Sequence, residues 1–474
     1  MIARALLLLA VTFGVTPLRA GSQVVAREAA IATGSRLSTA AGLEVLRNGG
    51  SAADAAVAAA FTLAVCHPQA GNLGGGGVLL YYDSASGAVW TLDFRVSAPS
   101  ARQSIGEETG SKTPIGVPGT VAGLESLHQR FGRLRWSELL APPAALAREG
   151  YVLDDEIAED LAHAREQRKI DRFPTTASIF FPRGNARTAG DTLVQPDLAS
   201  TLEQIGRQGA RELYSGATSK RIVAAAVAAG AAITPRDLEQ YRPVWRAPIR
   251  LDYGMYRIHV PPPPFAGGII LAEGLQILDE YQPLDPREVR GVHLLAEAER
   301  RAFLDVGHFF RNPGRRLPLE ELVSSEHAAR WKQSLDSRRA SSSVMLAAKM
   351  FQGDPVAGEH TTHISVADPE GNLASVTLSL GENFGSGLVV EGGGFFLNQI
   401  QSATAEASSS SSVSADLMMT PALVFAGEDP LLVIGSRGGA MIPTTLLQIF
   451  VDLGSGRRSL AEAVAAPRFH HQGF

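Results

Sequence analysis

Cysteine is almost absent from this chain: Cys66 is the only one among 474 residues. A single cysteine excludes any disulfide within the chain, even in an oxidising compartment. Cys66 lies in the apolar stretch AAVAAAFTLAVCHP, where we expect a small buried core residue. The sequence around it offers no cluster of metal ligands, and we expect the protein to use neither a metal nor an organic cofactor.

Basic residues are also fewer than acidic residues in this chain. Lys and Arg number 43 against 48 Asp and Glu, which gives a formal net charge of −5, and the chain has no basic block. These features exclude the electrostatic footprint of a nucleic-acid-binding protein. Apolar residues make up 45% and charged residues 19% of the chain, which is an ordinary balance for a globular protein.

The chain begins with an apolar run that is too short to cross a bilayer comfortably. This run, ALLLLAVTFGV, follows Arg4 and precedes TPLRA. A basic start, a short apolar run and a small-residue end are typical of a secretory signal peptide. We therefore expect residues 1–20 to be removed near Ala20 and the rest to be periplasmic or extracellular, without stable membrane association. A retained membrane anchor is the alternative.

The length of the chain predicts two lobes or one large layered domain, because one simple core rarely holds so many residues. Two helices are expected within 36–66, the second rich in alanine and capped by Ser51. A glycine loop and a strand pair follow, and residues 118–240 are mainly helical. Strand patterns then flank a long amphipathic helix at 288–310. Strands on both sides of a helical middle predict an α+β fold of stacked layers.

The stretch TTHISVADPEGNLASVTLSL predicts a β-hairpin. Apolar and polar residues alternate over 361–367 and 373–380, and the DPEGN between them is strong turn chemistry. A hairpin symmetric about Glu370 places Thr361 directly across from Ser379 on the same face. Two hydroxyl groups then meet at the open end of the hairpin. This pair fits either a catalytic site or a plain cross-strand hydrogen bond.

Several segments, in order from about residue 22 to the end, together resemble the γ-glutamyltransferase family of N-terminal-nucleophile hydrolases. They are GLEVLRNGGSAADAAVAAAFTLAV, GNLGGGGVLLYYD, LDFRVSAP, GVPGTVAGLESLHQRFG, PPPPFAGGI, TTHISVADPEGNLASVT, FGSG and GSRGG with PTTLLQ and APRFHHQ after it. Any one of them is a weak signal, since a GGGG loop alone is only a flexible loop. Together, the resemblance implies the four-layer αββα sandwich of these hydrolases.

The resemblance implies a precursor that cuts itself between His360 and Thr361. The protein would then be a heterodimer of a large fragment, 21–360, and a small catalytic fragment, 361–474. Residues 334–360, which lose periodicity and gain Ser, Gly and Pro, would be a linker that becomes the tail of the large fragment. Cleavage gives Thr361 a free α-amine, and its pKa of roughly 7.7–8.0 suits it to accept the hydroxyl proton near neutral pH.

The resemblance also implies roles for other residues of the site. Ser379 matches a second hydroxyl beside the nucleophile, and Gly438 and Gly439 match the pair of backbone N–H groups that forms the oxyanion hole. Arg95 matches the arginine that binds the α-carboxylate of the γ-glutamyl donor. From the residues alone, pairing of Arg95 with an acid such as Asp93 is the alternative.

Other positions depart from the family's donor-binding pattern. Val96 stands where an acid follows the arginine, and Gly381 stands where the family has Asn, with Asn383 close by. Apolar residues replace polar groups at four further positions: Ile400, Ala403, Leu417 and Met418. Each ligand charge left unpaired would cost on the order of 1–3 kcal/mol. Family members also continue beyond the position of Phe474, so we expect an exposed edge of the sandwich.

Three functions remain open on the sequence. The first is a self-processing hydrolase or transferase acting on small-molecule or peptide γ-glutamyl substrates such as glutathione. The second is an acylase for a less polar acyl amide, which the apolar replacements favour. The third is a non-catalytic binding descendant, against which the intact set of Thr361, Ser379 and two glycines argues. We expect His363 to be a strand residue, and His470 and His471 to be structural or surface residues.

Overall fold

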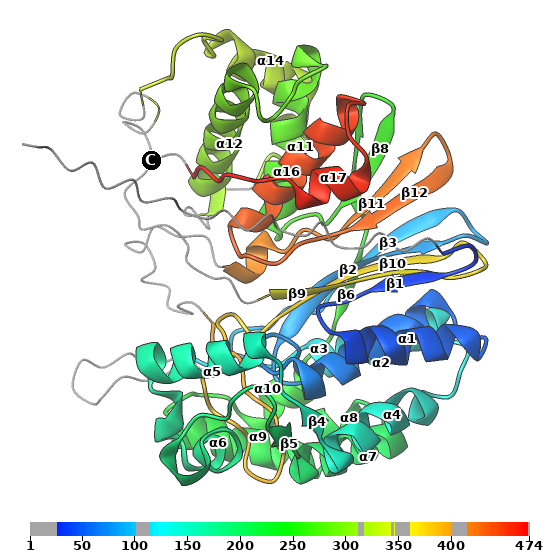
Figure 1. Cartoon of the computed structure of the whole chain (residues 1–474), viewed down its shortest axis with the longest axis vertical. Helices are drawn as coiled ribbons and strands as arrows, with labels where there is room; N and C mark the ends of the chain where they lie inside the picture. Colours follow the sequence, from blue (N-terminus) through cyan, green and yellow to red (C-terminus); the bar gives the residue numbers. More distant parts are fainter. Residues whose placement is uncertain are drawn as a thin grey trace, which may run out of the picture.

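The computed structural model describes residues 26–100, 114–310, 317–342, 346, 361–400 and 415–472. Within these ranges, two antiparallel sheets lie face to face in the middle of the molecule (Figure 1). The larger sheet has the spatial order β1 (Ala30–Ala32), β9 (Thr361–Ala367), β10 (Leu373–Ser379), β2 (Gly76–Asp83), β3 (Ala88–Asp93) and β6 (Val244–Arg246). The smaller sheet has the order β12 (Asp429–Ile434), β11 (Ala422–Ala426), β8 (Tyr256–Val260) and β7 (Ile249–Tyr253).

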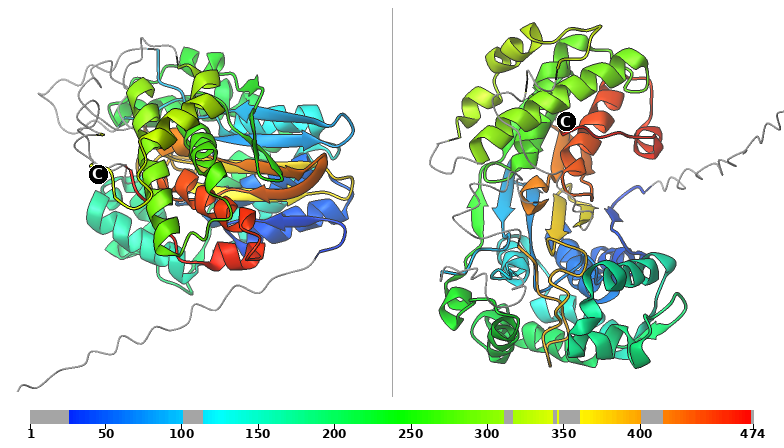
Figure 2. Two further views of the ribbon diagram at one scale, coloured as in Figure 1. Left: turned by 90° about the horizontal axis from the view of Figure 1, so that it is seen from above. Right: turned by 90° about the vertical axis from the view of Figure 1, so that its left-hand side faces the viewer.

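Helices cover the outer face of each sheet, as two views at right angles show (Figures 1 and 2). Those on the side of the larger sheet are α1 (Arg36–Arg47), α2 (Ala52–Cys66), α3 (Thr120–Phe131), α4 (Trp136–Glu149), α5 (Asp155–Arg168), α6 (Pro174–Phe180), α7 (Pro196–Gln208), α8 (Arg211–Tyr214), α9 (Ala217–Ala228) and α10 (Pro235–Gln240), with the short pair β4 (Tyr151–Val152) and β5 (Thr192–Leu193). Those on the other side are α11 (Ala266–Leu278), α12 (Val289–Phe310), α13 (Leu319–Leu322), α14 (Ser325–Gln333), α16 (Met441–Gly454) and α17 (Leu460–Ala465). This arrangement confirms the predicted four-layer αββα sandwich.

The alanine-rich helix α2 explains why this part of the sequence is so poor in large side chains. All of its residues are buried, and it contacts α1 and α4 on one side and β9 and β10 on the other. Ser51 begins the helix with a capping box, in which its hydroxyl and the Asp54 carboxylate each accept from the other's backbone N–H. Small side chains let the helix axis approach the sheet closely. Cys66, at the end of α2, is buried as predicted.

The two sheets pack through apolar side chains and a hydrogen bond between layers. Leu80 and Leu373 of the larger sheet form one buried cluster with Leu423 and Phe425 of the smaller sheet. The hydroxyl of Ser375 in β10 donates to the carbonyl oxygen of Ile434 at 3.0 Å. These contacts hold β9 and β10 beneath β11 and β12, which fixes the position of the predicted nucleophile relative to both sheets.

The register of the β9–β10 hairpin confirms the prediction from the sequence. Ala367 pairs with Leu373 at the turn, and Thr361 pairs with Ser379 at the open end. Asp368 holds the turn: its carboxylate accepts from the N–H groups of Glu370 and Asn372 and from the Asn372 side chain. It also accepts from Ala52 N–H at the start of α2, at 2.8 Å. One buried side chain therefore joins the hairpin to the helix beneath it.

We expect Asp368→Ala to lower the free energy of unfolding by about 3 kcal/mol or more, because it leaves buried N–H groups without an acceptor. Urea denaturation of the purified protein measures this change. Glu370→Ala is the matched control in the same turn: Glu370 pairs with Arg133 at the surface, 2.9 Å away, and such pairs contribute roughly 0–1 kcal/mol. Equal losses in the two variants would contradict the role given to Asp368.

Two predictions concern segments that are only partly described. The predicted signal peptide, 1–20, and the scissile residue His360 lie outside the described residues. The predicted linker, 334–360, is described only to 342 and at 346, and Ser341 within it donates through its N–H to the buried Glu297 carboxylate at 3.1 Å. Among the described helices, none combines the length and apolar character that crossing a membrane requires.

Candidate active site

Thr361, the predicted nucleophile, is the first residue of β9 and lies at the wall of a cavity of about 360 Å³. Its side chain is nearly buried, with 4% of the residue exposed. Its backbone pairs with Ser379 of β10, while β1 pairs only with residues 365–367 at the other end of β9, and these two partners fix the strand in the sheet. A nucleophile on a rigid strand at the edge of a cavity can approach a bound amide with a fixed orientation.

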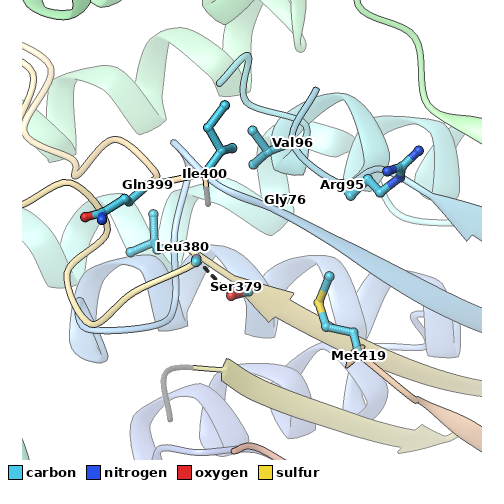
Figure 3. Close-up of a pocket in the computed structure, with 9 residues that line it drawn as sticks. Gly76, Arg95, Val96, Ser379, Leu380, Gln399, Ile400 and Met419 are labelled. Carbon is cyan, nitrogen blue, oxygen red and sulfur yellow. Dashed lines mark hydrogen bonds between the residues drawn. The ribbon is translucent and has the colours of Figure 1, made fainter. Parts of the chain in front are cut away.

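Ser379, directly across from Thr361, lies at the end of β10, where the chain turns sharply. Its hydroxyl accepts from the N–H of Gly381 at 2.9 Å (Figure 3). Gly381 has φ of +88°, and a side chain there would bring a Cβ within 1.9 Å of the Gln399 carbonyl oxygen. The position that the resemblance assigns to Asn therefore cannot hold one in this backbone. Gly381 acts on Ser379 through its N–H, and we predict no side-chain contact to substrate from it.

Gly438 and Gly439 form the turn that leads into α16, with φ of +117° and +53°. Gly438 lines the same cavity as Thr361. Among the described residues, no acceptor takes a hydrogen bond from the N–H of either glycine, while their carbonyl groups accept from Met441 and Ile442. Free N–H groups at the start of a helix, next to a nucleophile, suit the stabilisation of a developing negative charge.

Arg95 forms an ion pair with Asp93, which was the alternative to substrate binding that the sequence left open. Its Nε lies 3.3 Å from one Asp93 oxygen, and Arg246 holds the same carboxylate at 3.1 Å. The side chain is 35% exposed and points away from Ser379 and Ile400 (Figure 3). Arg95 nevertheless lines a recess with Ser379 and Gly381, so a role in binding a carboxylate stays a prediction.

This recess beside Ser379 is small and mainly apolar. Val96, Leu380, Ile400 and Met419 form most of its side-chain lining, and Val96 and Ile400 lie close together in Figure 3. Its volume of about 10 Å³ is roughly that needed for one water molecule. An acyl group could enter only if flexible side chains such as Met419 move, and it would then meet an apolar wall.

Two of the predicted apolar replacements do not line the recess. Leu417 and Met418 lie in or against the core cluster of the smaller sheet and its helices, and Met419 takes the place at the recess. The reason is local: Ala415–Met418 form a 3₁₀ turn in contact with α11, which carries these two side chains into the core. Ala403 lies outside the described residues.

The cavity beside Thr361 has polar walls that the sequence did not predict. Gln69 and Asp160 line it, and the Asp160 carboxyl lies beside the side chains of Gln69 and Asn383. Both amide side chains are buried, and neither has another side-chain hydrogen-bond partner among the described residues. Burial raises the pKa of Asp160, and the two neighbouring amides partly oppose this rise. Asn383 thus belongs to the Thr361 side of the site.

Charged side chains stand at the same cavity. Arg437, next to Gly438, forms an ion pair with Glu156 of α5, and both line the cavity together with His67. Burial lowers the pKa of His67. The ion pair joins the segment that carries the two glycines to the helix that carries Asp160. In the sequence these residues lie about 280 positions apart, and no local motif marks them.

His363 is a strand residue, as expected, and it is not one of the residues that line the cavity beside Thr361. Its ring nitrogens lie 3.0 Å from the hydroxyl oxygens of Thr377 and Ser365. Desolvation of the ring lowers its pKa to about 3. His470 similarly contacts the Thr444 hydroxyl and has its pKa lowered by burial to about 4.

The shifted pKa of His363 predicts a pH-dependent stability. Between pH 6.5 and about 3 the unfolded chain binds a proton that the folded chain does not, so stability falls as the pH drops through this range. For this ring we expect acidification from pH 7 to pH 5 to lower the free energy of unfolding by about 2 kcal/mol. Thermal unfolding of the wild type and of His363→Gln between pH 7 and 5 measures it. The variant should show the smaller loss on acidification; parallel curves would contradict the assignment.

A four-layer sandwich with a threonine at the first residue of a central strand, opposite a second hydroxyl, is the architecture of the N-terminal-nucleophile hydrolases. The profile of the family described as gamma-glutamyltranspeptidase matches residues 38–474. The chain belongs to this family.

Similar proteins of known name span most of the chain. A glutathione hydrolase proenzyme from Pseudomonas sp. (strain A14) is 33% identical over 99% of this chain and 86% of its own length. The proenzyme of the same name from Escherichia coli (strain K12) is 33% identical over 94% of this chain and 81% of its own. Both similarities extend across the two predicted fragments.

Two solved structures with different names superpose on this chain. The crystal structure of cephalosporin acylase from Bacillus halodurans superposes with a TM-score of 0.78 at 26% identity, covering 91% of this chain and 82% of that one. The gamma-glutamyltranspeptidase from Pseudomonas nitroreducens, complexed with L-DON, superposes with a TM-score of 0.61 at 33% identity, covering 67% of this chain and 97% of that one.

Proposed function

We propose that the protein is a self-processing acyltransferase or amidohydrolase that cleaves a γ-glutamyl amide through an acyl-enzyme on Thr361. The observation that carries the proposal is the pairing of Thr361 with Ser379 at the wall of a cavity that Gly438 also lines. The similarity to glutathione hydrolase proenzymes supports γ-glutamyl compounds as the donors.

In the proposed reaction, the α-amine of the cleaved Thr361 accepts the proton of its own hydroxyl while the oxygen attacks the amide carbonyl carbon. The N–H groups of Gly438 and Gly439 hold the oxyanion of the tetrahedral intermediate. The leaving amine takes the proton as the carbon–nitrogen bond breaks, and an ester on Thr361 remains. Water or a second amine then attacks the ester and restores the hydroxyl.

The same proposal includes the maturation and location of the protein. Cleavage between His360 and Thr361 would produce a heterodimer of fragments 21–360 and 361–474, held together by the interleaved strands of the larger sheet. In that sheet β9 and β10 of the small fragment lie between β1 and β2 of the large fragment. Removal of residues 1–20 during export would place the enzyme in the periplasm or outside the cell.

A second candidate is an acylase for a less polar acyl amide. The observation that favours it is the apolar lining of the recess beside Ser379, formed by Val96, Ile400 and Met419. A zwitterionic glutamyl head bound there would leave charges unpaired, at roughly 1–3 kcal/mol each. The structural similarity to a cephalosporin acylase is in line with this candidate.

Release of p-nitroaniline from γ-glutamyl-p-nitroanilide and from hexanoyl-p-nitroanilide tests the two candidates side by side. A kcat/KM at least tenfold higher on the γ-glutamyl amide supports the first, and the reverse order supports the second. Activity on neither substrate, in protein that has cut itself before Thr361, would contradict both donor assignments.

A further inference from the structure

Three ionisable side chains meet in the helical layer above the smaller sheet, among α11, α12 and α14. They are Glu273, Asp305 and His327, and their ligand-type atoms all lie within 4.8 Å of one another. His327 Nε2 lies 2.6 Å from an Asp305 oxygen and 3.4 Å from Glu273 Oε1. The cluster shares no residue with the cavity of Thr361 or the recess beside Ser379.

Glu273 is the unusual member of this cluster. It is completely buried, with 0% of the residue exposed, and neither carboxylate oxygen has a hydrogen-bond partner among the described residues. A buried carboxylate whose polar neighbours are one imidazole, 3.4 Å away, and a second carboxylate is costly, because it loses its hydration and gains little in return. Its Oε1 lies 3.4 Å from His327 Nε2, and its carboxylate lies within 4.8 Å of Asp305, so a further ligand at the centre of the cluster would contact all three side chains.

A second buried glutamate in the same layer shows how the fold satisfies an ordinary structural carboxylate. Glu297 of α12 receives hydrogen bonds on one oxygen from Arg300 and the N–H of Ser341, and on the other from Arg301 and the Ser341 hydroxyl. Each of its oxygens is satisfied by protein donors. Glu273 has no such set, so packing of the helices alone does not account for it.

We propose that Glu273, Asp305 and His327 form a binding site for one divalent transition-metal ion, with Zn²⁺ as the ion that best fits. Two carboxylates and one imidazole are a donor set that zinc accepts, with a fourth position open to water. With a neutral imidazole, the two positive charges of the ion balance the two negative charges of the carboxylates.

The spacing fits such an ion. Zinc binds oxygen and nitrogen at roughly 2.0–2.1 Å, so two ligands of a tetrahedral ion lie about 3.3 Å apart. The 3.4 Å between His327 Nε2 and Glu273 Oε1 matches this distance. The 2.6 Å between His327 and Asp305 is a hydrogen bond, and it would open by about 0.7 Å as the ion replaces the shared proton.

The surroundings can hold and admit an ion. The indole N–H of Trp331 donates to Asp305 at 2.5 Å, a contact that orients this carboxylate. Asp305 and His327 are partly exposed, at 15% and 13%, which provides a route from solvent. Arg330 donates to His327 Nδ1 at 3.0 Å and pairs with Glu321 at the surface. A metal ion on Nε2 shifts the ring proton of His327 to Nδ1. The contact of Arg330 with Nδ1 then breaks, and Arg330 keeps its ion pair with Glu321.

The site would join three helices of one layer. Glu273 comes from α11, which packs against the sheet, Asp305 from α12 and His327 from α14. An ion held by all three stabilises the folded chain in proportion to its occupancy, because the unfolded chain cannot present these ligands together. The expected role is therefore structural and separate from acyl transfer.

Isothermal titration of the full-length protein, stripped with EDTA and dialysed, tests the proposal with ZnCl₂. We expect one ion per chain and a Tm that rises with zinc concentration. Glu273→Gln should weaken binding by roughly 100-fold or more, since loss of even an outer partner of a ligand costs ~10–100-fold. The matched control is Glu321→Gln, an exposed acid close to the cluster, which should bind zinc as the wild type does.

A further measurement does not depend on the variants folding. Co²⁺ added to the stripped wild type should give the visible absorption of a low-coordinate site, and one equivalent of Zn²⁺ should remove it. Binding of zinc with the same dissociation constant in Glu273→Gln would overturn the proposal, since the ion would then sit on surface histidines. Failure of the wild type to bind Zn²⁺ or Co²⁺ would overturn it as well.

Discussion

Thr361→Ala is expected to leave the chain as one piece and to reduce acyl transfer by about 10⁴- to 10⁶-fold, because the substitution removes the proposed nucleophile. The wild type should instead give two fragments, the smaller beginning Thr-Thr-His. Intact mass and amino-terminal sequencing after overnight incubation measure cleavage, and p-nitroaniline release measures transfer. Both losses follow from one hydroxyl, since it serves first in maturation and then in catalysis.

Two control variants separate the loss of the nucleophile from damage to the strand. Thr361→Ser keeps a hydroxyl at the same point, so it should still cut itself and retain activity well above that of Thr361→Ala. Thr362→Ala changes the next residue of β9, which is also buried, and it should leave cleavage intact. A wild-type protein that folds but remains uncut would sink the acyl-enzyme mechanism for this chain.

The hairpin that carries Thr361 could be predicted from the sequence because its determinants are local. The alternation of residues 361–367 and the turn at Asp368 set the register, and the register alone puts Thr361 across from Ser379. The two glycines before α16 could be placed for a similar reason, since a helix start follows directly. What their N–H groups face is a property of the assembled fold.

The walls of the site could not be predicted, because they come from segments far apart in the chain. Asp160 of α5 lies beside Gln69, which follows α2, and Asn383, which follows β10, so three distant segments of the chain form this wall. The sequence also could not show where the apolar Leu417 and Met418 lie: a 3₁₀ turn before β11 places them in or against the core and not at the recess. Glu273 of α11 contacts His327 of α14, and no local sequence motif around either residue predicts this contact.

The recess beside Ser379 leads to the second prediction with a large effect. Val96→Asp should raise kcat/KM on γ-glutamyl-p-nitroanilide by roughly 10- to 100-fold, because a hydrogen bond between charged groups contributes about 1.5–3 kcal/mol. The same change should lower kcat/KM on hexanoyl-p-nitroanilide by a similar factor, because a buried carboxylate then faces an apolar chain. Asp is close to Val in size, so it fits where Val96 packs against Gly116.

Val96→Asn is the matched control, since it has the shape of Asp without the charge. Among the described residues that line it, the recess lacks a negative charge that could pair with the α-amine of the γ-glutamyl donor, and Asn does not supply one. Val96→Asn should therefore raise kcat/KM on the γ-glutamyl amide only slightly, well below the gain of Val96→Asp. A variant that is merely destabilised would lose activity on both substrates. Capture of the new carboxylate by Arg95, its neighbour in the recess, would also abolish the gain. Opposite changes on the two substrates therefore identify Val96 as the residue that decides between a γ-glutamyl and an apolar donor.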